Sequence, residues 1–172
     1  MIYLIGVDHI KSQWEYQNGS NKKFVSSFTN ILRRHVKRLN VTVVAEEFNQ
    51  ECLDQQDVKI STAQRVAEEF CIKHIFCEPP AKERIKLGIL SKEEISQQLF
   101  HKELWQIPDD TLEQQLINGN HQKYFAKREQ YWLDKIKDLK EKRILFICGR
   151  SHIESFKKLL EEHEFKVSIL SS

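Results

Sequence analysis

Glycine and long apolar runs are scarce in this sequence of 172 residues, and each shortage excludes a class of protein. None of the five glycines belongs to a GxGxxG fingerprint, a Walker A loop or the Gly-x-Ser-x-Gly elbow of a serine hydrolase. No apolar run approaches the ~18 residues of a transmembrane helix. The apolar start MIYLIGVDH is too short for a signal peptide and lacks a basic beginning. We therefore expect a cytoplasmic protein with no membrane partner.

Cysteine is also sparse, and the four cysteines form no close CxxC pair. They are Cys52, Cys71, Cys77 and Cys148, and three of them lie in apolar segments. Disulfides or a zinc site are the alternatives, but buried free thiols in a reducing cytoplasm are the simpler interpretation.

An excess of charge of one sign is absent as well. Lysine and arginine number 27 against 25 aspartates and glutamates, so the net charge is only +2. A dedicated nucleic-acid binder usually has a clear basic excess, and we therefore expect no nucleic-acid partner. The length and the 40% hydrophobic content suit one domain with a real core, covering residues 1–172. The oligomeric state stays open.

Five short apolar runs are present, and polar residues follow the first four of them. They are nearly continuous rather than alternating, which is typical of strands buried on both faces of a parallel sheet. Helical spacing of apolar residues lies between several of these runs. The alternation predicts a Rossmann-like α/β fold, with a mostly parallel sheet flanked by helices. The predicted strands are Ile2–Val7, Val41–Ala45, His74–Cys77, Arg143–Cys148 and Lys166–Leu170.

Residues 79–142, between the third and fourth predicted strands, form one long helical insertion that could serve as a lid. Ser91 with Glu94 indicates a capping box for a helix through Phe100. The segment His121–Leu139 is expected to be the longest helix. Outside the insertion we expect helices over Ser20–Leu39, Thr62–Cys71 and Ser151–His163.

Polar side chains that could carry chemistry follow the first four predicted strands. In open α/β sheets, ligands bind in the crevice beyond the carboxyl ends of the strands. If the strands are parallel and adjacent, these groups converge in one pocket, although any one polar strand end means little alone. The candidates are His9, Glu46, Glu47, Glu78 and His152.

Two Gly-x-x-His segments, Gly6–His9 and Gly149–His152, mark strand-to-loop transitions. Glycine there allows a tight turn or a close approach of the backbone. Histidines grouped with carboxylates could bind a divalent metal of the manganese, zinc or cobalt type, with His9, Glu78 and His152 as ligands. The same groups could do acid/base work without a metal. Because neighbouring strand residues face opposite sides, Glu46 and Glu47 compete for one role.

The order GVDH, AEE, CEP, KREQYW, CGRSH resembles the superfamily that unites TraB/PrgY and TIKI proteins with ChaN-like and erythromycin-esterase-like proteins. Those chains carry paired Gly-x-x-His motifs, glutamates at the strand ends between them, and an arginine in a helix before the second motif. The resemblance implies an α/β fold with its active cleft at the strand ends. This chain is shorter than most members, so its insertion is trimmed.

Activities within the superfamily differ: TIKI members are described as metal-dependent proteases, erythromycin esterases are hydrolases, and ChaN-like members bind haem. Carried over, the resemblance implies roles for His9 and His152, for Glu46 or Glu47, for Glu78, and for Arg128 as the helical arginine. We expect a hydrolase-like enzyme, with a peptide, ester or phosphoester as its small-molecule or peptide substrate. The alternative is a non-catalytic protein that binds a small ligand or a partner protein in the same cleft.

Overall fold

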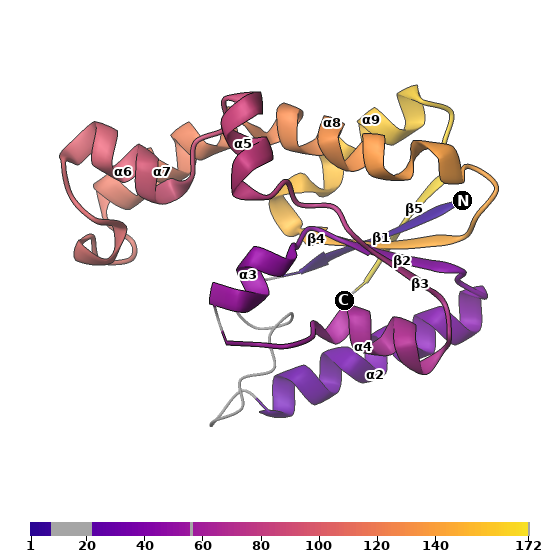
Figure 1. Cartoon of the computed structure of the whole chain (residues 1–172). Coiled ribbons are helices and arrows are strands. Elements are labelled where there is room, and N and C mark those ends of the chain that lie inside the picture. The colour runs from indigo at the N-terminus through magenta and orange to yellow at the C-terminus, as the bar shows by residue number, and fades with distance from the viewer. Residues whose placement is uncertain (8–21, 56, 172) are drawn as a thin grey trace.

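Five parallel strands form one sheet in the computed structural model, which describes residues 1–7, 22–55 and 57–171 (Figure 1). The strand order is β3-β2-β4-β1-β5, and each neighbouring pair is parallel. The predicted α/β fold with a parallel sheet is therefore confirmed, and each predicted apolar run overlaps a strand. The strands are β1 (Ile2–Val7), β2 (Val43–Glu46), β3 (Lys73–Phe76), β4 (Ile144–Gly149) and β5 (Val167–Leu170).

Helices cover both faces of the sheet, which explains why its strands are apolar on both sides. Helices α2 (Lys22–Leu39) and α4 (Thr62–Glu69) lie on one face, and α8 (Phe125–Ile136) and α9 (Ile153–Glu162) lie on the other (Figure 1). Successive strand residues alternate between the two cores: Leu145 packs with the α2 and α4 side chains, whereas Phe146 packs with those of α8 and α9.

The segment between β3 and β4 is helical, as the sequence predicts. Its members are α5 (Ala81–Leu87), α6 (Lys92–Phe100), η1 (Leu104–Gln106), α7 (Leu112–Gln122), α8 and η2 (Lys137–Leu139). Helix α8 packs on the sheet, whereas α6 and α7 extend beyond it and share a small core of Ile95, Ile107 and Ile117 (Figure 1). The predicted capping box at Ser91 and Glu94 is present.

The prediction of one long helix over His121–Leu139 is wrong. Helix α7 ends at Gln122, α8 begins at Phe125, and a 3-10 turn follows α8. The break arises because the Tyr124 N–H donates to the carbonyl of His121, three residues back, before the Arg128 N–H starts a new ladder on Tyr124. The longest helix among the described residues is α2, with 18 residues.

The turn after β4 packs tightly on β1, and Gly6 makes this possible. A Cβ atom at Gly6 would lie 2.9 Å from Ile153 Cγ1 and 3.3 Å from the Arg150 Cα. Residues Arg150–His152 form a 3-10 turn, η3, that leads into α9. The close approach of two backbones therefore requires a glycine at this strand end.

All four cysteines are free thiols. Cys77 and Cys148 are buried as expected, and burial raises the pKa of both thiols. The expectation of burial is wrong for Cys71, which is exposed just past the end of α4. Among the described residues, no helix combines the length and the apolar character needed to cross a membrane.

Candidate functional site

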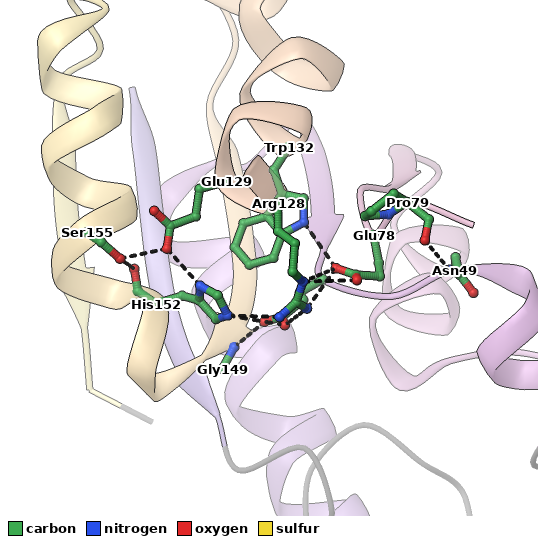
Figure 2. Close-up of polar contacts among 10 residues, drawn as sticks. Asn49, Glu78, Pro79, Arg128, Glu129, Trp132, Gly149, His152 and Ser155 are labelled. Carbon is green, nitrogen blue, oxygen red and sulfur yellow. Dashed lines mark hydrogen bonds and ion pairs between the residues drawn. The ribbon is translucent and has the colours of Figure 1, made fainter. Parts of the chain in front are cut away.

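Four of the predicted site residues come together at the carboxyl ends of β2, β3 and β4 (Figure 2). Glu47 follows β2 directly, Glu78 lies just beyond β3, and His152 ends the turn after β4. Helix α8 places Arg128 between them. Parallel strands bring their carboxyl ends to one edge of the sheet, and for this reason residues distant in sequence meet here.

Arg128 is the centre of the cluster. Its Nη2 donates to Glu47 Oε1 and, at 2.8 Å, to Glu78 Oε2. Its Nε donates to Glu78 Oε1 at 3.1 Å. Burial alone would lower the pKa of Arg128, but Glu78 and Glu47 together raise it above its usual value. The guanidinium therefore stays charged and holds two carboxylates from different strands.

His152 is buried between Arg128 and Glu129. Its Nδ1 lies 2.7 Å from Glu129 Oε1, and its Nε2 lies 3.2 Å from Arg128 Nη1. A guanidinium can only donate hydrogen bonds, so Nε2 accepts and Nδ1 carries the proton that it donates to Glu129. The Ser155 hydroxyl donates to the same Glu129 oxygen at 2.6 Å. In this tautomer a carboxylate orients the imidazole through Nδ1, an arrangement that suits a general base.

Two aromatic side chains and one backbone N–H also contact the histidine and the glutamates of the cluster. The Phe125 and Trp132 rings lie 3.7 and 4.8 Å from the His152 ring, centroid to centroid. The Trp132 indole N–H donates to Glu78 Oε2 at 3.2 Å. The Gly149 N–H donates to Glu47 Oε2 at 2.6 Å and so ties the ends of β2 and β4 together.

Glu46, the other predicted glutamate of this pair, faces the opposite side of the sheet. It is fully buried on the side of α4, where its Oε1 accepts from the Ser61 hydroxyl at 2.5 Å and lies 2.8 Å from His74 Nε2. Its Oε2 has no hydrogen-bond partner among the described residues. Glu46 does not line the pocket at the strand ends, so the structure assigns the pocket role to Glu47.

The predicted metal ligands are His9, Glu78 and His152, and His9 lies outside the described residues. Glu78 and His152 both direct their polar atoms at the Arg128 guanidinium. Within the described ranges, no group of three or more His, Cys, Asp or Glu side chains could hold a metal ion. Because His9 is one of the three predicted ligands, the metal site stays a prediction.

A pocket of about 550 Å³ opens over the cluster. Glu47, Glu78, Arg128 and His152 line one side, and the helical insertion supplies most of the rest, from α6, α7 and the start of α8. Five lining residues of these helices could not be predicted from the sequence, because no local pattern indicates that α6, α7 and α8 meet beside the strand ends. They are Lys92, Asn118, His121, Gln122 and Phe125.

His121 differs from an ordinary surface histidine. Burial, followed by the charges of Arg128 and Lys92, lowers its pKa to about 4. The imidazole is therefore neutral near neutral pH and can act as a hydrogen-bond donor or acceptor in the pocket.

Comparison with protein-family models, with curated proteins and with solved structures finds no significant match to this chain. The resemblance to the TraB/PrgY and TIKI superfamily therefore stays a prediction.

Proposed function

We propose that this protein is a hydrolase-like enzyme in which His152 is the general base. The observation that carries the proposal is the Glu129–His152 pair, in which a carboxylate holds Nδ1 at 2.7 Å and Nε2 contacts Arg128. Both His152 and Arg128 line the pocket. An imidazole fixed in one tautomer, with its other nitrogen accepting, can take a proton from water.

The proposed reaction is attack of water on an ester, peptide or phosphoester bond. The Arg128 contact to His152 Nε2 loosens, and Nε2 takes the proton from the attacking water. The Arg128 Nη1 group then donates to the oxygen on which negative charge develops. The bond to the leaving group then breaks, and the protonated His152 gives its Nε2 proton to the departing oxygen or nitrogen. Glu129 does not touch the substrate; it is a positioning residue that keeps the imidazole in the correct tautomer.

The first prediction is that His152→Gln and His152→Ala abolish hydrolysis while the protein stays folded. A panel of chromogenic carboxylic esters, peptide anilides and phosphate esters measures activity, and circular dichroism measures folding. His163→Ala is the matched control, since His163 is exposed at the far end of α9. Wild-type turnover in a folded His152→Gln protein would contradict the proposal.

Glu129→Gln tests the positioning role separately. The amide can donate to Nδ1 and impose the wrong tautomer, so kcat should fall by about 10²–10⁴-fold with KM unchanged. Glu129→Asp should recover part of kcat.

Assays in chelator and with added manganese, zinc or cobalt test the metal prediction, because loss of activity in chelator would show that a metal is needed.

A non-catalytic binding protein is the second candidate. The observation in its favour is that Glu47, Glu78 and His152 all bond to Arg128, a network that can also serve to shape a ligand pocket. Ligand binding with no turnover on any substrate of the panel would favour this candidate.

A cytoplasmic location also stays part of the proposal, and the four free thiols support it.

A further inference from the structure

Lys92 is a cation of the pocket wall whose one described acidic neighbour, Glu93, forms no ion pair with it. Its side chain is half-buried at the start of α6, and it makes no hydrogen bond or ion pair with any residue in the described ranges. Other lysines of the same insertion do have partners: Lys86 pairs with Glu83, Lys102 pairs with Glu113, and Lys123 bonds to Asn120. A half-buried ammonium without a counter-ion is costly unless a ligand supplies one.

Arg128 faces the same cavity and keeps one N–H group available. Four of its five N–H groups are used by Glu78, Glu47 and His152, and one on Nη1 has no partner within the described part of the chain. Lys92 and Arg128 line the same pocket. Burial lowers the pKa of Lys92, the neighbouring Glu93 raises it in part, and the charge of Arg128 lowers it, so the two cations repel each other. An anion placed between two such cations relieves their repulsion and binds to both.

The carboxylates of the cluster do not fill this position. Glu47 bonds to Arg128 and Gly149, and Glu78 bonds to Arg128 and Trp132, whereas neither is within ion-pair distance of Lys92. Glu93, next to Lys92 in sequence, is exposed and lies outside this pocket's lining. The carboxylates that line the pocket are therefore directed at Arg128, and the negative charge nearest to Lys92 is that of Glu93, outside the lining.

Neutral donors of α7 surround the same space. Neutral His121 carries one N–H, and Asn118 accepts from Gln114 through its Oδ1 at 3.4 Å, which leaves its Nδ2 amide as a donor. Gln122 adds a second amide to the lining. Cations together with neutral N–H donors are the groups that recognise carboxylates and phosphates.

We propose that the pocket binds an anionic group of its ligand, a carboxylate or a phosphate, between Lys92 and Arg128. The assignment rests on the proposed function, because it names the substrate class of the same site: a molecule with one anionic end held by the insertion and its reacting bond near His152.

The second prediction concerns anion binding, measured by isothermal titration calorimetry with inorganic phosphate and with acetate as separate probes. The wild-type protein should bind at least one of them, and the stronger probe indicates whether the anionic group is a phosphate or a carboxylate. Lys92→Met should weaken that binding by at least about tenfold, as expected for one charged hydrogen bond, whereas Lys92→Arg should largely keep it.

Lys123→Met is the matched control, since Lys123 belongs to the same insertion but does not line the pocket, and it should bind as the wild type does. Equal binding by wild type and folded Lys92→Met, or no binding of either probe by the wild type, would overturn the proposal. His152→Gln separates the two proposals: it should lose hydrolysis but keep anion binding. Anion binding without hydrolysis in the wild type refutes only the proposed reaction.

Discussion

Glu46 and Glu47 show at the scale of single residues what the sequence can and cannot reveal. Both follow an apolar strand, and strand geometry requires adjacent side chains to face opposite sides. That rule predicts that only one of them faces the pocket, but it does not say which. The choice depends on the packing of helices from distant parts of the chain: α8 brings Arg128 to Glu47, whereas α4 brings Ser61 to Glu46.

The sequence predicts His152 from its place after a strand, whereas Arg128 was a candidate only through the family resemblance. The role of Glu129 was not predictable, because its significance depends on the position of His152, 23 residues further along the chain. Helical periodicity places Arg128 and Glu129 on one helix but does not show that both side chains are buried toward the strand ends.

Removal of the Arg128 charge gives the third prediction. Arg128→Met leaves Glu47 and Glu78 buried without their counter-ion, so the free energy of unfolding in urea should fall by about 3–5 kcal/mol. Arg33→Met is the control, because the exposed ion pair between Arg33 and Glu69 should contribute only about 0–1 kcal/mol. Adding Glu47→Gln and Glu78→Gln to Arg128→Met should recover part of the loss. An Arg128→Met loss no larger than that of Arg33→Met would contradict the structural role given to this cluster.

At the scale of secondary-structure elements, the break between α7 and α8 is the feature that the sequence concealed. No glycine or proline lies between His121 and Leu139, and apolar residues continue at helical spacing across the break. The turn at Lys123 and Tyr124 places His121 and Gln122 in the pocket wall. The turn that brings these two residues into the pocket wall therefore has no local signal in the sequence.

The small core shared by α6 and α7 gives the fourth prediction. Ile117 is fully buried there, apart from the two cores that cover the sheet, and Ile117→Ala should cost about 2–5 kcal/mol of local stability. Hydrogen exchange measured by mass spectrometry should speed up in α6 and α7 while β1 and β4 keep their protection. Leu116→Ala, at an exposed neighbouring position, is the control. Equal loss of protection in the sheet would show that the insertion and the sheet unfold together.

At the scale of the whole molecule, the strands and the parallel sheet were predictable, but the strand order was not. Apolar runs without alternation indicate strands covered on both faces. The central place of β4 results from packing that no local pattern encodes, since β4 joins the β2–β3 pair to the β1–β5 pair. The site forms where β2 and β4 adjoin, so its composition also follows from this order.

The dependence of global stability on pH gives the fifth prediction. His121 has a pKa of about 4 in the folded chain, against 6.5 as its ordinary value, because of burial and then Arg128 and Lys92. The unfolded state therefore binds a proton at a higher pH than the folded state does, and stability falls as the pH drops from about 6.5 to about 4. The groups around His121 also include Glu47, which opposes this effect.

His121→Gln should remove its share of that loss. Urea unfolding of the variant between pH 7 and pH 4 should therefore show a shallower decline than the wild type does. His163→Gln, at an exposed position, should leave the decline unchanged. A decline as steep in His121→Gln as in the wild type would show that His121 is protonated alike in the folded and unfolded chains.

The central place of β4 has a further consequence for how quickly the chain reaches its native state. Strand β1 pairs with β4 and β5 in the sheet, so Ile2 must meet Ile144 and Val167. By contrast, only the short α3 (Gln50–Gln55) and α4 separate β2 from β3 in the sequence. Pairing Ile2 with Ile144 closes a loop of most of the chain, and this closure costs chain entropy before native contacts compensate for it. The β2–α4–β3 unit can therefore form early, and insertion of β4 between β2 and β1 is the step that should set the folding rate.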